Sequence, residues 1–353
     1  MPSLLRTILT TLTAALAVSA RPHPTKITSN LTVSVLHDFG YPSWLENLAV
    51  RSSGEILTTR MDSPALYQVN HLTGTPVEIA TWNGSQWGGC LGIAEGKTDK
   101  FYVILAALFD QATFLKTGGV NAVFEVDMGT FHLAADGTTV NRAATVRHVT
   151  DIPEADFLNG MATLDDSHVF VSDVYSGTVY LVNVETGKYS LAVDDDLMKW
   201  SVAGDPPPTY LGSNGLKVHG GYLYWSNTAA GFLARVKIGS NGLPVGESSV
   251  AVTNVAKADD FQFGSDGRVF VAQNQMDTLS VACPLASGNV SVAASAIAGS
   301  DVSTVLAGVT SPKFGRTARD SNRLYLSTSG ALGLPINGSV TVAGTISYID
   351  IDF

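Results

Sequence analysis

The sequence predicts an all-β chain folded as one six-bladed β-propeller over residues 21–353. Helical periodicity is nearly absent, and short apolar strands recur between Gly, Asn, Asp and Ser turns. The same order of strand, turn and polar residue occurs six times. A content of 45% hydrophobic and 15% charged residues excludes a disordered chain or a coiled coil. A β-sandwich or two stacked β domains is the alternative, because these also contain many short strands.

Each of the six copies is expected to form one sheet, with its first strand nearest the ring axis. The inner strands are expected at 46–50, 91–94, 159–162, 214–218, 259–263 and 310–314. The second strands are expected at 56–59, 101–105, 169–173, 222–227, 269–272 and 322–327. The third strands are expected at 66–70, 123–127, 179–183, 232–238, 279–283 and 346–350. An additional early strand at 31–39 is expected to complete the last sheet and close the ring, which leaves no long unpaired edge.

Residues 1–20 are typical of a secretory signal peptide. They contain Arg6, an apolar run over 7–18 and the small-residue ending Val18–Ala20. The run is too short to cross a bilayer, and no later apolar stretch reaches ~18 residues. We therefore expect a secreted protein without a membrane span. Four Asn-x-Ser/Thr sequences are candidate glycosylation sites, namely Asn30, Asn83, Asn289 and Asn337.

Charge and cysteine content restrict the partners and the covalent structure. The net charge of -10 argues against a nucleic-acid surface, because phosphate binding relies on clustered Lys and Arg. A small apolar organic molecule is the expected partner, and no protein partner is evident. Cys90 falls in the second copy and Cys283 in the fifth, on opposite sides of a six-fold ring. We therefore expect two buried free thiols rather than a disulfide.

Polar residues open four of the six inner strands, where a propeller points side chains toward its axis. These residues are Glu46, Asn159, Asn214 and Asp259. Two carboxylates and two amides suit calcium, which prefers hard oxygen ligands. The alternative is that they are ordinary turn residues in front of strands. Leu91 and Ser311 are expected to break the pattern in the second and sixth copies.

Several of these segments resemble the six-bladed propellers of the gluconolactonase, senescence-marker-protein and paraoxonase group. The resemblance covers residues 31–353 and lies in Trp44–Leu48, Asn159–Gly160, Ser213–Leu216 and Asp259–Gly267. It implies a catalytic calcium held by Glu46, Asn159, Asn214 and Asp259, with Asp259 or an acidic neighbour as base. Asp260 departs from the family pattern, which has glycine or asparagine after this ligand.

Two segments, Trp44–Arg51 and Asp259–Phe261, are similar to those of secreted fungal members of this group. Some members of that subgroup are hetero-Diels-Alderases of tropolone sesquiterpenoid pathways, joining a tropolone quinone methide to a humulene-type alkene. The resemblance implies this cycloaddition, which requires no cofactor. A calcium-dependent lactone hydrolase and a non-catalytic binding propeller are the alternatives.

The loops expected beside the inner-strand openers supply the remaining candidates. Arg60 and Tyr175 are expected to donate hydrogen bonds to developing oxygen charge in a cycloaddition. An apolar pocket with a few polar groups suits a small organic ligand. The expected substrate-binding residues are Trp44, Asp62, Phe109, Asn227, Asn274 and Met276.

Overall fold

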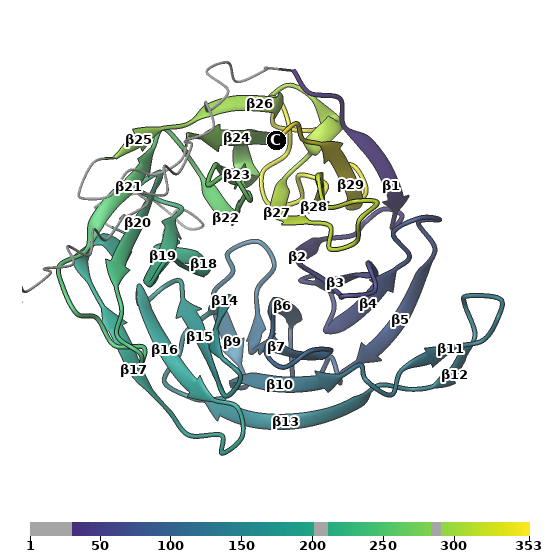
Figure 1. The fold of residues 1–353 in the computed structure, drawn as a ribbon, viewed down its shortest axis with the longest axis horizontal. Helices are drawn as coiled ribbons and strands as arrows, with labels where there is room; N and C mark the ends of the chain where they lie inside the picture. Colours follow the sequence, from purple (N-terminus) through teal and green to yellow (C-terminus); the bar gives the residue numbers. More distant parts are fainter. Residues whose placement is uncertain (1–29, 201–210, 284–290) are drawn as a thin grey trace, which may run out of the picture.

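The six blades predicted from the sequence are present in the computed structural model, which describes residues 30–200, 211–283 and 291–353 (Figure 1). Each blade is an antiparallel four-stranded sheet whose first strand lies innermost. The first blade consists of β2 (Leu45–Val50), β3 (Ile56–Arg60), β4 (Ala65–Val69) and β5 (Pro76–Thr81). The second consists of β6 (Gly89–Glu95), β7 (Lys100–Ala106), β10 (Asn121–Asp127) and β13 (Thr145–Ile152). The third consists of β14 (Leu158–Asp165), β15 (His168–Asp173), β16 (Thr178–Asn183) and β17 (Tyr189–Asp194).

The remaining blades follow the same order, and the last one contains a strand from the start of the chain. The fourth blade consists of β18 (Ser213–His219), β19 (Tyr222–Asn227), β20 (Phe232–Lys237) and β21 (Ser249–Thr253). The fifth consists of β22 (Ala258–Phe263), β23 (Val269–Gln273), β24 (Thr278–Ala282) and β26 (Ser295–Gly299). The sixth consists of β27 (Val309–Phe314), β28 (Arg323–Thr328), β29 (Thr345–Asp350) and β1 (Ser34–Asp38). β1 pairs antiparallel with β29, from Ser34 opposite Tyr348 to Asp38 opposite Thr345. The early strand therefore closes the ring as predicted.

A few short elements lie outside this plan. The insertion in the second blade forms the hairpin β8 (Leu108–Phe109) and β9 (Lys116–Gly118), and a second hairpin pairs β11 (His132–Leu133) with β12 (Val140–Arg142). β25 (Val292–Ala293) runs parallel to β21. Helical structure in the described ranges is limited to 3-10 turns at Asp196–Met198, Asn274–Met276 and Thr304–Leu306, and none of these is long enough to cross a bilayer.

The apolar core is divided into clusters, with one between each pair of neighbouring blades. Both faces of each sheet are covered, so the second strands are buried at almost every position, as in β3, and the inner strands are buried over their first four residues, as in β14. Cys90 is buried in the cluster between the first two blades, as expected. Cys283 is exposed, which corrects the expectation of a second buried thiol: it lies just beyond β24, where the neighbouring blade no longer covers it. Both thiols are free.

Hydroxyl groups on the second strands tie the inner strands of neighbouring blades together. Ser172 Oγ accepts from the Gly160 N–H of its own blade at 2.8 Å and donates to the Asn214 carbonyl of the next blade at 2.7 Å. The corresponding donor bonds elsewhere run from Thr59, Ser226 and Ser327 to the carbonyls of Leu91, Asp259 and Glu46. A Cβ on Gly160 would lie 2.0 Å from the Asn214 carbonyl oxygen, so this position accepts only glycine. These contacts fix the register of the inner strands around the axis.

The predicted signal peptide, 1–20, lies outside the described residues, as does the candidate glycosylation site Asn289. The other three candidates, Asn30, Asn83 and Asn337, are exposed. Their glycosylation stays a prediction.

Candidate functional site

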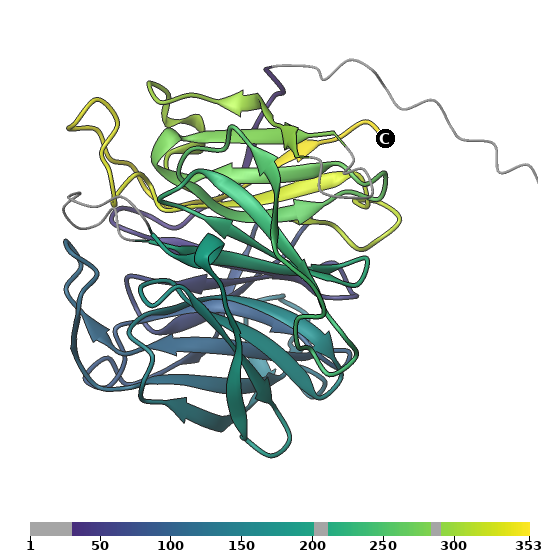
Figure 2. The ribbon, with the colours of Figure 1, turned by 90° about the vertical axis from the view of Figure 1, so that its left-hand side faces the viewer.

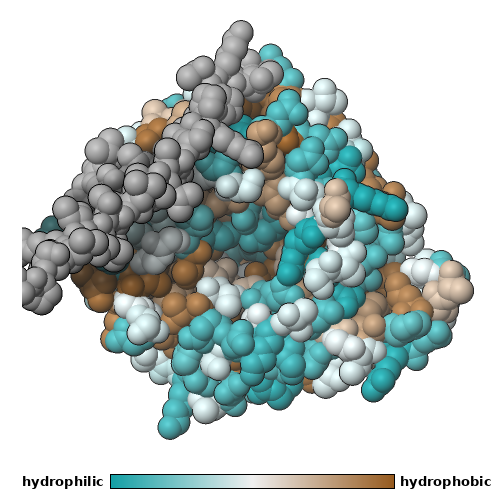
Figure 3. Space-filling model, in the orientation of Figure 1, coloured by the Kyte–Doolittle hydropathy of each residue, from teal (hydrophilic) through white to brown (hydrophobic). Residues whose placement is uncertain are grey.

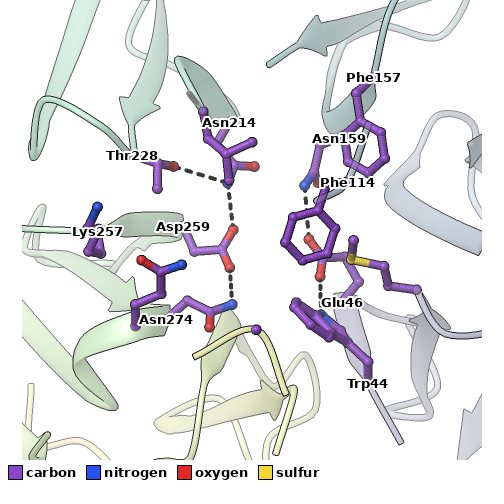
Figure 4. A pocket seen from close by; sticks show the side chains of 14 residues that line it. Trp44, Glu46, Phe114, Phe157, Asn159, Asn214, Thr228, Lys257, Asp259 and Asn274 are labelled. Carbon is purple, nitrogen blue, oxygen red and sulfur yellow. Dashed lines mark hydrogen bonds between the residues drawn. The ribbon is translucent and has the colours of Figure 1, made fainter. Parts of the chain in front are cut away.

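The structure brings the four polar strand openers together at one end of the ring axis (Figure 4). Glu46, Asn159, Asn214 and Asp259 are the second residues of β2, β14, β18 and β22, and all four line one cavity. The rest of the wall is mainly apolar, with a few polar side chains. It consists of Trp44, Met61, Phe114, Phe157, Leu211, Thr228, Lys257, Asn274, Gln275 and Gly333.

The remaining two inner strands present Leu91 and Thr310 at this register. Leu91 interrupts the polar set as predicted. In the sixth blade, Val309 pairs with Thr328 and Pro312 with Leu326, so Thr310 stands where Glu46 stands in the first blade. This corrects the expected Ser311 by one residue. Thr310 is not a wall residue, because its hydroxyl donates to the Leu45 carbonyl at 3.0 Å.

Glu46 is 2% exposed, and both of its carboxylate oxygens accept hydrogen bonds. Trp44 Nε1 donates to Oε2 at 2.7 Å, and Asn159 Nδ2 donates to Oε1 at 3.0 Å. The Asn159 Oδ1 atom is buried without a hydrogen-bond partner. Glu46 is thus held by an indole that can only donate and by an amide whose oxygen remains available.

Asp259 lies across the cavity and is held in the same manner (Figure 4). Asn214 Nδ2 donates to Oδ1 at 2.9 Å, and Asn274 Nδ2 donates to Oδ2 at 2.8 Å. Thr228 Oγ1 accepts a longer bond from Asn214 at 3.2 Å and donates to the Ala258 carbonyl at 2.6 Å. Two buried acids therefore face one small space, each bound by neutral N–H donors.

Burial makes both acids unusually weak. Loss of water raises the pKa of Glu46 to about 7, against the hydrogen bonds from Asn159 and Trp44 that lower it. Burial, followed by the charge of Glu46, raises the pKa of Asp259 well above its ordinary value. Burial also acts to raise the pKa of the adjacent Asp260, but Lys217 and Lys313 hold it below its ordinary value. The cavity thus retains protons on carboxyl groups near neutral pH, while Asp260 stays ionised.

The donor set is chemically suited to calcium. Glu46, Asp259 and the two amides offer hard oxygen ligands from four blades, and the unpartnered Oδ1 of Asn159 is a buried acceptor that a cation would satisfy. Both amides here turn N–H toward a carboxylate, so cation binding requires that the Asn214 amide turn over to present oxygen. Calcium at this site stays a prediction.

Several expected site residues lie outside this cavity. Arg60 forms an ion pair with Asp62, the residue two positions later. The Tyr175 hydroxyl donates to the Thr113 carbonyl at 3.3 Å, beside a separate surface hollow. Asn227 donates to the carbonyls of Leu197 and Lys199.

Other expected residues support the wall from behind or form part of it. Phe109 packs edge-on against the wall residue Phe157, with ring centroids 5.2 Å apart. Met276 ends the 3-10 turn that begins at Asn274, and only Asn274 is a wall residue. Trp44 and Asn274 are thus the two expected substrate-binding residues that line the cavity.

Sequence reasoning missed Lys257, Thr228 and Phe157. Lys257 adopts a left-handed conformation with φ of 56°, two residues before Asp259, and this turn brings it to the cavity. Its proximity to Asp259 in the sequence is a signal that could have found it. Phe157 likewise precedes Asn159 by two residues, and Trp44 precedes Glu46 by two, so the position two before three of the four openers lies in the wall.

The chain is similar to two proteins over most of its length, although no model of a known protein family matches it. It is 25% identical to the provisionally named hetero-Diels-Alderase asR5 of Sarocladium schorii, covering 94% of this chain and 85% of that protein. It is 26% identical to a provisionally named hetero-Diels-Alderase of a Phoma species, covering 89% of this chain and 91% of that protein. The resemblance seen in the sequence is therefore confirmed.

Solved structures show the same fold at low sequence identity. The calcium-binding protein regucalcin of Agrobacterium tumefaciens str. C58 superposes with a TM-score of 0.56 at 12% identity, covering 93% of this chain and 98% of that one. A luciferin-regenerating enzyme superposes with a TM-score of 0.60 at 11% identity, covering 91% and 95%. At these identities, the likeness concerns the propeller fold alone.

Proposed function

We propose that the chain is an enzyme that catalyses a hetero-Diels-Alder cycloaddition in the cavity between Glu46 and Asp259. The observation that carries this proposal is the similarity, over about nine-tenths of the chain, to two relatives named for this reaction. We further propose a tropolone quinone methide and a humulene-type sesquiterpene as substrates, from the resemblance to fungal tropolone sesquiterpenoid enzymes. A cycloaddition needs no nucleophile, so the protein has to align the partners, exclude water and stabilise charge.

The cavity walls supply apolar contact surface for such partners. Trp44 and Phe114 meet edge to face with ring centroids 5.7 Å apart, and Phe157 continues this side of the wall (Figure 4). Flat aromatic side chains can hold a planar quinone methide against an alkene and keep water from its electrophilic carbon. Binding both partners in one orientation lowers the entropic part of the barrier and selects one face of the diene.

The acid pair supplies a hydrogen-bond donor for the reacting oxygen. When a quinone methide acts as a heterodiene, negative charge develops on its carbonyl oxygen. A neutral carboxyl group can donate to that oxygen, and the raised pKa values of Glu46 and Asp259 keep protons there near neutral pH. The Lys257 side chain at the rim is a second candidate donor. We therefore assign oxygen stabilisation to these three residues, in place of Arg60 and Tyr175.

The cavity has to widen to admit two substrates. Its volume is about 50 Å³, well below the roughly 300 Å³ at which small-molecule sites begin. Phe114 contributes to the wall from the β8–β9 hairpin, where its φ is 56°. Displacement of this hairpin would open the apolar side and leave the inner strands in place.

If calcium binds, Glu46, Asn159, Asn214 and Asp259 would hold it. Bound there, it would supply positive charge to a substrate oxygen. This donor set is also the observation that favours the second candidate, a calcium-dependent lactone hydrolase. In that reaction Asp259 would be the base that manages the attacking water.

The test of the proposed reaction is a stereochemical one, because the uncatalysed cycloaddition proceeds in solution. Purified protein is incubated with humulene and with a tropolone quinone methide generated in situ. The products are then separated by chiral chromatography and detected by mass spectrometry. We expect a rate above background and one enantiomer in excess. Racemic product at the background rate refutes the proposal, and hydrolysis of a lactone panel that depends on added calcium would replace it with the second candidate.

We also propose that the protein is secreted and glycosylated, on the basis of the 1–20 segment and the exposed Asn30, Asn83 and Asn337. Enzymatic removal of N-linked sugars from protein secreted by a eukaryotic host should lower its apparent mass. Unchanged mass contradicts glycosylation, and retention in the cell contradicts secretion.

A further inference from the structure

A second cavity lies at the opposite end of the ring axis. All six inner strands contribute to it from their later residues, for example Val50, Glu95, Thr163, Lys217, Gln262 and Lys313. Its volume is about 460 Å³, and it shares no wall residue with the cavity around Glu46 and Asp259. The face of the molecule shown in Figure 3 is hollowed near its centre, and the side view in Figure 2 places the C-terminus toward that face.

The charged side chains of this second cavity are only partly paired. Lys217 forms an ion pair with Asp260, which is 3% exposed, and Ser311 Oγ donates to the other oxygen of Asp260 at 2.8 Å. Arg316 pairs with Glu95 and donates to the Val50 carbonyl at 2.9 Å. Both carboxylates therefore already have a cation.

Lys313 is the cation left over. Among the described residues no carboxylate lies within ion-pair distance of it, and the nearby charge of Asp260 is shared with Lys217, whose ammonium group lies next to that of Lys313. Burial, followed by the charge of Lys217, lowers the pKa of Lys313 to about 7. Two neighbouring ammonium groups that share one carboxylate are costly to keep charged, and an anion placed between the two lysines would reduce that cost.

We propose that this opposite mouth of the channel binds an organic carboxylate, with its charged end at Lys313 and its apolar body in the cavity. The apolar body would contact Ile93, Met161 and Phe314, which line the same space. The overall charge of -10 does not favour anions, so the attraction arises from the local excess of one positive charge. The site is distinct from the proposed reaction site, and its occupancy can be measured without any turnover.

The test uses benzoate as the probe and benzamide as its neutral counterpart of the same shape. Each is titrated into the purified full chain at pH 6 and followed by ligand-observed NMR. We expect benzoate to bind at least tenfold more tightly than benzamide, and K313M to weaken benzoate at least tenfold. Equal binding of the two probes overturns the proposal, because it shows an apolar hollow without an anion site.

Control variants locate the site and distinguish a loss of binding from a folding defect. K188M, on an exposed turn, and K257M, at the other cavity, should bind benzoate as the unmodified chain does. If K257M rather than K313M loses binding, the anion occupies the first cavity and the proposal fails. K313Q, which keeps a polar group, replaces K313M if that variant does not fold. Inorganic phosphate is the third probe, and binding of phosphate alone overturns the assignment to an organic carboxylate.

Discussion

Replacing Glu46 by Gln should remove a pH dependence of stability that the buried acid imposes on the protein. In the folded chain the pKa of Glu46 is about 7, and its ordinary value is 4.5. Because the folded state holds the proton more tightly, the stability associated with this group is fully present below pH 4.5 and is lost as pH rises through 7. Each pKa unit of difference between the folded and unfolded states corresponds to ~1.4 kcal/mol, so roughly 2 to 3 kcal/mol of stability is lost between pH 5 and pH 8.

The amide of E46Q does not titrate, so the stability of this variant should lack the fall between pH 5 and pH 8 that Glu46 causes. For a domain of roughly 300 residues, a loss of this size corresponds to a shift of about 3 to 5 °C in the unfolding temperature. The measurement is a melting curve at half-unit steps from pH 5 to pH 8 for both proteins. The difference between the two proteins reports the titration of Glu46 together with the effect of its charge on the pKa of Asp259, since all other titrating groups are shared. Parallel curves would refute the reasoning, because they would show that Glu46 is ionised or solvated in the folded protein.

Four further outcomes are expected. K257M should lower the cycloaddition rate above background by about tenfold, because it removes one charged hydrogen bond. K188M is the control and should leave the rate unchanged. Equal rates for K257M and the unmodified chain would show that Lys257 takes no part in the reaction. Calcium content measured by mass spectrometry should approach one ion per chain at pH 8. It should fall at pH 5.5, because protons then compete with calcium for Glu46. A protein that retains no calcium at pH 8 would contradict the metal prediction. G160A should destabilise the protein by about 3 kcal/mol or prevent folding, because the new Cβ meets the Asn214 carbonyl, whereas G118A, with open space around it, should be neutral. F114A should raise the rate for bulky alkenes and reduce the enantiomeric excess, and an unchanged product ratio would show that the hairpin does not bound the site.

The repeat in the sequence was sufficient to predict the ring, its closing strand and the four polar openers. The repeat indicates which residue begins each inner strand. In a propeller, that position determines which side chains converge near the ring axis. The expected Ser311 was one residue late because every inner strand has an irregular register near its start, and such a bulge is not visible in the composition of the strand.

Contacts made by loops were less predictable. Arg60 is the last residue of β3, and Asp62 follows two residues later and pairs with it, so the guanidinium is not available to the cavity. Lys257 reaches the wall through a left-handed backbone conformation, which glycine, asparagine and aspartate favour but which a lysine does not predict. Cys283 was expected inside because thiols are usually buried, yet the end of a strand can extend beyond its neighbours.

The pairing of β1 with β29 has a consequence for how the protein is made. In the described part of the chain a ribosome produces β1 first and β29 more than 300 residues later, so the sixth sheet cannot assemble until the chain through residue 350 has left the exit tunnel. Until then, β1 and the exposed side of the first blade lack their partners, and a chaperone has to shield them or they are open to association with other chains. Ribosomes stalled before residue 345 should therefore carry a chain that a protease digests throughout, and release of the last strand should confer resistance in a single step.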